Sequence, residues 1–197
     1  MLFVHASADL YGSDITLLQL VSGLERDEFR ATVVVPYEGP LVARLREAGA
    51  KVLVCPGLPV IRRQNMNPGG LLRLVISLRS VWWLAGLIRR RNVALVHGNT
   101  LAVAPVGFAA WLARRPQVWH VHEIVVGPRS IAALLATLSS SLSTVVVANS
   151  KATADHYRRT RLATPTPIRV VLNGVEDSRV RTRAEMPLRP IVGAGLG

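Results

Sequence analysis

The sequence predicts an α/β domain built on a Rossmann-like, doubly wound parallel sheet, and two observations support this prediction. Short strand-like segments alternate with helix-like segments along most of the 197 residues, which is the pattern of repeated β-α units. Several strand-like segments are continuous hydrophobic runs, as expected for a parallel sheet that is buried on both faces. Half of the residues are hydrophobic, which excludes a solvated disordered chain and suffices for one domain with a full core.

The first half of the chain begins with a short apolar strand and a helix whose apolar residues recur at helical spacing. The second strand ends at Pro36, the next helix is closed by Gly49, and the third strand ends at Pro56. A loop rich in Pro, Asn and Gly then leads to a long helix. The expected ranges are Leu2–His5, Asp14–Leu24, Ala31–Val35, Pro40–Ala48, Lys51–Cys55, 56–70 and Leu71–Arg91.

The second half repeats the pattern of strand and helix and ends with a strand before Asn173-Gly174. The expected ranges are Val93–His97, Leu101–Ala113, Gln117–Val121, Ile131–Leu142, Thr144–Ala148, Lys151–Arg159 and Ile168–Leu172. We therefore assign residues 1–176 to one domain. Residues 177–190 are polar and look like a linker, and 191–197 look like the first strand of a further domain, so we expect a fragment or a truncated gene.

The positive charge is concentrated in the middle of the chain. The formal net charge is +12, and residues 48–122 contain ten Lys or Arg but no Asp or Glu. Such a region attracts phosphates, an acidic membrane surface or nucleic acid. A GC-rich genome would explain the preference for arginine over lysine, but not the missing acids. Nucleic-acid binding is disfavoured, because aromatic residues are few and neither a stacking platform nor a helix-turn-helix pattern is evident.

The N-terminus lacks the basic and apolar segments of a secretory signal, and the single Cys55 permits no disulfide within the chain. Residues 92–113 and 130–150 lack formal charge, but polar residues and Pro105 make each read as a strand beside a buried helix, not as a membrane span. We expect a cytoplasmic protein, with possible contact to the inner face of the cell membrane.

The expected helix 71–91 has two distinct faces. The line toward the core is Leu71, Val75, Leu78, Trp82 and Ala85. A second line, Arg79, Trp83, Gly86 and Arg90, resembles a stripe for a membrane interface or a ligand. The alternative is that Trp83 packs beneath the preceding loop. Together with Arg62 and Arg63 of that loop, Arg79, Trp83 and Arg90 are the expected membrane or anion contacts.

Polar residues follow the strands at the edge where a parallel sheet binds ligands. Those that we single out as cleft or acceptor contacts are Asn99, Glu123, Asn149, Ser150, Asn173 and Gly174. Gly12-Ser13 opens a helix, where backbone N–H groups bind phosphate. A simple N-cap by Ser13 or Asp14 is the competing explanation. Neither the GxGxxG fingerprint of dinucleotide binding nor a Walker A motif is present.

His120 and His122 alternate along a strand end and should point to the same face. A zinc pair is conceivable, but no further ligands follow at metal spacing. A polar role for His122 in the cleft and a structural role both remain open. No Ser-His-Asp or Cys-His set is legible from the sequence.

Four segments together resemble the N-terminal half of the family 4 glycosyltransferases, which are retaining enzymes of the GT-B fold. They are Phe3–Leu18, Val118-Trp119-His120-Val121-His122-Glu123, Val147–Ala154 and Val170-Val171-Leu172-Asn173-Gly174-Val175. The resemblance implies transfer of a sugar from a nucleotide-diphosphate sugar to a hydroxyl acceptor. It further implies His122 as the catalytic cleft residue, Gly12 and Ser13 at the donor phosphates, and no cofactor or metal.

Two departures from the family pattern matter. The family's Gly-Gly turn has one glycine here, Gly12, and the donor-binding C-terminal domain is missing, so we expect this chain alone to be inactive. The positive region and Trp83 favour a lipid-linked or phosphorylated acceptor. An alternative is a non-catalytic acceptor- or membrane-binding subunit of a split glycosyltransferase. Other Rossmann-like enzymes share the fold, but the weak glycine pattern argues against them.

Overall fold

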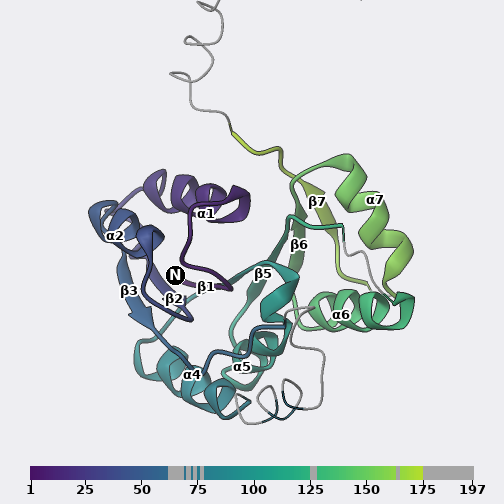
Figure 1. Ribbon diagram of the computed structural model, residues 1–197, viewed down its shortest axis with the longest axis horizontal. Helices are drawn as coiled ribbons and strands as arrows, with labels where there is room; N and C mark the ends of the chain where they lie inside the picture. The colour runs from purple at the N-terminus through teal and green to yellow at the C-terminus, as the bar shows by residue number, and fades with distance from the viewer. Residues whose placement is uncertain are drawn as a thin grey trace, which may run out of the picture.

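The computed structural model describes residues 1–61, 69, 72, 75, 78–124, 128–162 and 165–174. Seven parallel strands form one sheet in the order β3-β2-β1-β4-β5-β6-β7 (Figure 1). The strands are β1 Leu2–His5, β2 Thr32–Val35, β3 Lys51–Val54, β4 Val96–Asn99, β5 Gln117–Val121, β6 Val145–Ala148 and β7 Ile168–Val170. The helices are α1 Gly12–Ser22, α2 Pro40–Glu47, α4 Arg79–Arg90, the 3-10 helix η2 Leu101–Val106, α5 Gly107–Leu112, α6 Arg129–Ser141 and α7 Lys151–Thr160.

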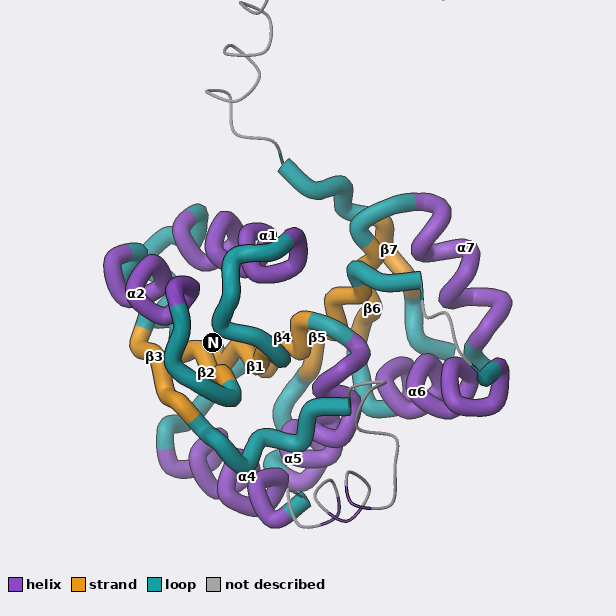
Figure 2. Tube along the Cα trace, in the orientation of Figure 1, coloured by secondary structure: helices purple, strands orange, loops and turns teal. Residues whose placement is uncertain are grey.

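Helices lie on both faces of the sheet, which confirms the predicted doubly wound α/β architecture (Figures 1 and 2). The strand order reverses direction at β1, so right-handed crossovers place α1 and α2 on one face and the later helices on the other. Each face has its own core. Phe3, Leu17 and Leu41 belong to the core beneath α1 and α2, whereas Leu84 and Trp119 belong to the core beneath the later helices.

The fourth strand lies three residues later than its predicted start. A turn with Asn92 at φ 47° follows α4, and the chain enters the sheet only at Val96. Gly98 and Asn99 are therefore strand residues and not part of the following loop. The single helix predicted at 101–113 is split into η2 and α5, since Pro105 has no N–H to donate to a regular helix.

The predicted core face of α4 was mostly wrong. Leu78 and Trp82 are exposed, at 41% and 67%, whereas Ala85 is buried as predicted, together with Val81, Leu84, Leu87 and Ile88. The buried residues still follow the spacing of an amphipathic helix, but they lie on a different face from Trp82. Trp83 is exposed, as its membrane or ligand interpretation requires. Leu71, Arg62, Arg63 and residues 175–197 lie outside the described residues.

Among the residues that the structure describes, no helix is long and apolar enough to cross a membrane.

Candidate functional site

The ends of β1, β4 and β5 bring four polar side chains together, those of His5, Asn99, His120 and His122. The pairing of β1 with β4 aligns His5 with Asn99, and the pairing of β4 with β5 aligns Asn99 with His120. His122 follows β5 directly, and its Nε2 lies 2.9 Å from Asn99 Oδ1. The carboxyl edge of the sheet therefore forms a connected polar cluster, as expected for an open parallel sheet.

A buried pair of His5 and Asp14 anchors this cluster. Both residues are 1% exposed, and His5 Nε2 is hydrogen-bonded to Asp14 Oδ1. The Tyr11 backbone N–H donates to Asp14 Oδ2 at 2.9 Å. Burial alone would raise the pKa of Asp14, but the hydrogen bonds from His5 and Tyr11 outweigh it and hold the pKa below its usual value. The pair fixes the start of α1 against the end of β1.

Asn99 connects this pair to His122. It is fully buried, and its Nδ2 lies 3.2 Å from the Ser13 backbone oxygen and 3.1 Å from His5 Nδ1. Its backbone oxygen lies 2.9 Å from His5 Nδ1. Asn99 is therefore a structural centre of the cluster, and its side chain is already hydrogen-bonded on both sides.

Three imidazoles form a row on the α1 side of the sheet. The ring centroids of His97 and His120 are 5.7 Å apart, and those of His120 and His122 are 4.0 Å apart, which confirms that His120 and His122 face the same way. Burial and the neighbouring imidazoles lower the pKa of His97 and of His120 to about 3. Burial is the main cause that lowers the pKa of His122 to about 4, and electrostatic repulsion from His5 and His97 lowers it further. All three rings are neutral at pH 7.

The helix that follows β1 starts differently from its expected N-cap. The N-cap residue is Tyr11, and Asp14 accepts the Tyr11 N–H from the third helical position, so neither Ser13 nor Asp14 is the cap. Within the described part of the chain, no hydrogen bond engages the N–H groups of Gly12 and Ser13. A Cβ atom on Gly12 would meet nothing within 4 Å, so this turn borders open space.

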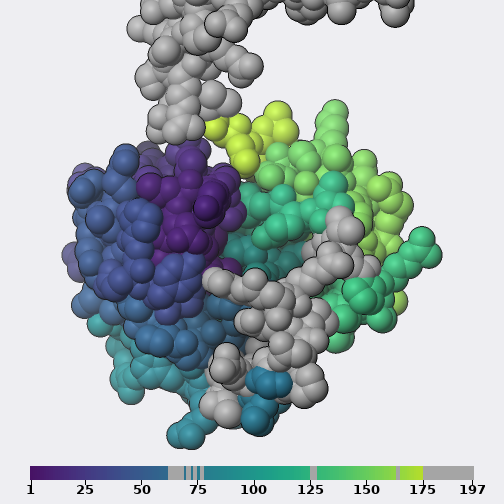
Figure 3. Space-filling model, in the orientation of Figure 1, coloured from purple at the N-terminus to yellow at the C-terminus, as the bar shows by residue number. Residues whose placement is uncertain are grey.

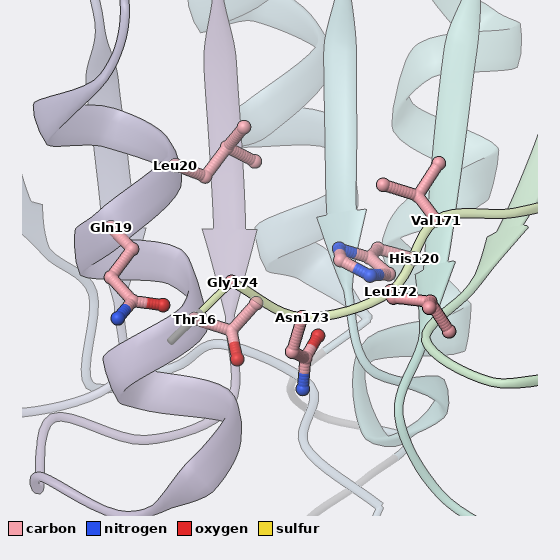
Figure 4. Close-up of a pocket in the computed structure, with 8 residues that line it drawn as sticks. All are labelled: Thr16, Gln19, Leu20, His120, Val171, Leu172, Asn173 and Gly174. Carbon is pink, nitrogen blue, oxygen red and sulfur yellow. The ribbon is translucent and has the colours of Figure 1, made fainter. Parts of the chain in front are cut away.

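A pocket of about 330 Å³ lies beside the cluster, between α1 and the segment after β7. It is lined by Thr16, Gln19, Leu20, His120, Val171, Leu172, Asn173 and Gly174 (Figure 4). The space-filling view shows purple α1 atoms and the yellow end of the described chain on either side of teal atoms (Figure 3). Both ring nitrogens of His120 are buried, and neither has a hydrogen-bond partner among the described residues. Asn173 and Gly174 thus line a pocket, and their predicted role as cleft or acceptor contacts stays a prediction.

The other predicted rim residues have mostly structural partners. Ser150 caps α7 by accepting the Thr153 N–H at 3.0 Å, and Asn149 Oδ1 accepts from the Thr153 hydroxyl at 2.9 Å. Asn149 Nδ2 also reaches the backbone oxygen of His122 at 3.4 Å, so Asn149 helps to place His122. Glu123 is half-buried, and its Oε2 has no hydrogen-bond partner.

Within the described ranges, no group of three or more His, Cys, Asp or Glu is arranged to hold a metal ion. His120 and His122 lack the further ligands that zinc requires, so the zinc interpretation gains no support.

His5, Thr16 and Gln19 were not predicted from the sequence, and Asp14 was considered only as a helix cap. A usable signal existed for Asp14: an acid three residues after the N-cap is typical of a helix start. His5 gave no such signal, because its role depends on the pairing of β1 with β4. Thr16 and Gln19 line the pocket only because the chain returns to α1 after β7.

Comparison with known proteins identifies a family and a fold. The family model "Glycosyltransferase Family 4" matches residues 11–179. No curated protein matches the chain. A solved structure from Anabaena, Alr3699/HepE in complex with UDP-glucose, is 21% identical to this chain, with a TM-score of 0.66. The match covers 93% of this chain and 49% of the HepE chain.

Two further solved structures have the same fold. MurG of Acinetobacter baumannii is 16% identical to this chain, with a TM-score of 0.59, and the match covers 95% of this chain and 50% of the MurG chain. A segment of sucrose-phosphate synthase from Thermosynechococcus elongatus is 11% identical to this chain, with a TM-score of 0.53, and the match covers 93% of this chain and 95% of that segment. The chain thus spans about half the length of HepE and MurG.

Proposed function

The chain belongs to glycosyltransferase family 4, and from this premise we propose that it forms the acceptor side of a glycosyl transfer. In that reaction a sugar moves from a nucleotide-diphosphate donor to a hydroxyl group. The Rossmann-like fold, which this chain shares with one half of the GT-B structures, supports the assignment. HepE binds UDP-glucose in its crystal, which supports a nucleotide sugar as the donor here.

The observation that carries the proposal is the hydrogen bond of His122 to the buried Asn99 at the carboxyl edge of the sheet. Two neighbouring strand ends hold the imidazole there, close to a pocket. Because the pKa of His122 is lowered to about 4, the ring is a weak base near pH 7. His122 therefore contributes by hydrogen bonding to a reactant and orienting it, and not as a general base.

Gly12 and Ser13 are the proposed contacts of the donor phosphates. Their N–H groups have no partner among the described residues, and the space above Gly12 is open. Unengaged N–H groups at the start of a helix stabilise an anion. Backbone N–H groups and cationic side chains would offset the charge of the departing nucleotide without a metal ion.

The proposed acceptor is lipid-linked or phosphorylated, and the protein would meet it at the inner face of the cell membrane. Residues 48–122 contain no acid, and Trp82 and Trp83 are exposed on α4 between arginines at both ends of the helix. Exposed tryptophan beside arginine is the composition of a surface that lies in the headgroup region of an anionic bilayer. Both the family match and the structural neighbours favour a transferase over a non-catalytic binding subunit.

The test uses a protein in which this domain is joined to a donor-binding domain, because the chain spans only about half the length of HepE and MurG. Sugar transfer is measured from UDP- and GDP-sugars to polyprenyl phosphate and to soluble glycan acceptors. Transfer that depends on His122 supports the proposal. Absence of transfer and of nucleotide hydrolysis with every donor, in a protein that binds none of them, would refute it.

A further inference from the structure

The Asn99 amide has partners on both of its sides, and they fix which way it faces. On one side its Nδ2 lies 3.2 Å from the backbone carbonyl oxygen of Ser13. On the other side its Oδ1 lies 2.9 Å from His122 Nε2. A carbonyl oxygen only accepts hydrogen bonds, so the amide nitrogen must face Ser13. The Ser13 carbonyl therefore suffices to set the amide orientation, and the same nitrogen also lies 3.1 Å from His5 Nδ1.

This orientation determines where His122 carries its proton. The Asn99 Oδ1 atom only accepts, so His122 Nε2 must donate. The ring is neutral near pH 7 and has one N–H, which leaves Nδ1 unprotonated. His5 does not compete for this arrangement, because its Nδ1 lies 2.9 Å from the Asn99 backbone oxygen, which is also only an acceptor.

We propose that Asn99 is a positioning residue that transmits the orientation of the Ser13 carbonyl to His122 and holds it in the Nε2–H tautomer. The ring nitrogen left for a ligand is then an acceptor. His122 accordingly selects a hydrogen-bond donor, such as a hydroxyl group, and disfavours a phosphate oxygen. That the hydroxyl belongs to a sugar or to the acceptor rests on the proposed function, whereas the tautomer does not.

The arrangement also joins two parts of the site. Ser13 belongs to the turn proposed for the donor phosphates, and its carbonyl is two hydrogen bonds away from His122. A shift of that turn would move the Ser13 carbonyl away from Asn99 Nδ2 and so weaken the hydrogen bond between Asn99 Oδ1 and His122 Nε2. The phosphate turn and the cleft histidine thereby act as one unit.

Histidine-selective ¹⁵N NMR of this chain at pH 7 tests the proposal, since the shifts of the two ring nitrogens report which one is protonated. The expected wild-type spectrum has the His122 proton on Nε2, in slow exchange with water. In Asn99→Ala, this N–H should exchange rapidly. His156 on α7 serves as the reference, and its ring signals should stay unchanged in the variant.

Asn99→Asp supplies a second readout. A carboxylate keeps an acceptor facing His122 but gives up the donor to the Ser13 carbonyl. The Nε2–H should therefore persist, and the added negative charge should make His122 titrate at a higher pH than in the wild type. Among the described residues, the titratable groups around His122 are His120, stacked at 4.0 Å, and His5 and His97. Asp14 lies behind His5, and the half-buried Glu123 follows His122 in the chain. Their titrations are followed in the same spectra.

A wild-type proton on Nδ1 would overturn the proposal, as would an unchanged Nε2–H signal in Asn99→Ala. Because Asn99 is fully buried, the alanine variant could fail to fold, and the wild-type spectrum and Asn99→Asp then decide. An Nε2–H tautomer in a protein that binds no nucleotide sugar would refute the proposed function and leave the role of Asn99 intact.

Discussion

The indole ring of Trp119 occupies the space that a side chain at Gly98 would need. A Cβ atom on Gly98 would lie 3.1 Å from two ring carbons of Trp119, and the two residues are register partners on β4 and β5. Trp119 is fully buried, so the ring has little freedom to move aside. We expect Gly98→Ala to destabilise the fold by about 1–3 kcal/mol, the usual cost of overpacking.

The measurement is urea unfolding of Gly98→Ala beside Gly12→Ala. The second variant is the matched control, because a Cβ on Gly12 meets no atom within 4 Å. Equal midpoints for the two variants would show that the Trp119 ring does not constrain residue 98.

The sheet could be predicted from the sequence because its strands are short apolar runs separated by turn residues. Six of the seven predicted strands overlap the observed ones closely, and β4 was misplaced because its last residues, Gly98 and Asn99, look like a turn. Only the fit of Gly98 against Trp119 shows why glycine is part of a strand there. The face of α4 was mistaken for a related reason, since the size and apolarity of Trp82 did not decide its burial.

The site was predictable in part. His122, Asn99, Asn173 and Gly174 follow strands or end them, so the edge of the sheet gathers them. The buried pair of His5 and Asp14 was not predictable, because it depends on α1 turning back over the end of β1. Likewise, the structural role of Ser150 as the N-cap of α7 could be recognised only from its contact with Thr153.

Removing the Asp14 carboxylate should be strongly destabilising. Both Asp14 and His5 are almost fully buried, and a buried ion pair that loses one partner typically costs about 3–5 kcal/mol. We expect that loss for Asp14→Asn in urea unfolding at pH 7. The double variant His5→Gln with Asp14→Asn replaces both members of the pair and should recover part of the loss. A single variant within about 0.5 kcal/mol of the wild type, the range of ordinary surface changes, would contradict the pairing.

Replacement of His122 should impair transfer without unfolding the domain. His122 is half-buried and lies outside the strands, so His122→Ala leaves the core intact. The loss of one hydrogen bond to a reactant should lower kcat/KM by about 10- to 100-fold in a protein that also carries a donor-binding domain. His156→Ala on α7 is the control. Unchanged turnover in His122→Ala would remove His122 from the mechanism.

The exposed face of α4 should bind anionic bilayers. We expect this chain to float with vesicles of phosphatidylcholine and phosphatidylglycerol and not with phosphatidylcholine alone, and the binding should weaken with salt. Trp82→Ala with Trp83→Ala should lower binding several-fold, because both tryptophans are exposed beside arginines. Leu134→Ala, an exposed apolar residue on α6, should have no effect. Equal flotation of both variants would place the contact elsewhere.

Acid should unfold this domain earlier than its composition suggests, because His97 and His120 are buried as neutral rings. In the unfolded chain a histidine binds its proton below about pH 6.5, whereas in the folded chain the pKa of each of these two is about 3. Between these values the unfolded state binds more protons, so the free energy of unfolding falls as the pH falls, by up to about 1.4 kcal/mol per pH unit for each histidine.

Urea unfolding at pH 8, 6.5, 5.5 and 4.5 measures this slope. Stability should be level above pH 7 as far as these two residues are concerned, and it should decline steadily below pH 6.5. His97→Gln removes one of the two groups and should make the decline shallower by about one proton, whereas Leu162→Gln, exposed and without a titrating group, should leave the slope unchanged. A slope in His97→Gln equal to that of the wild type would mean that this imidazole is already protonated in the folded protein, and the neutral histidine row would then be wrong.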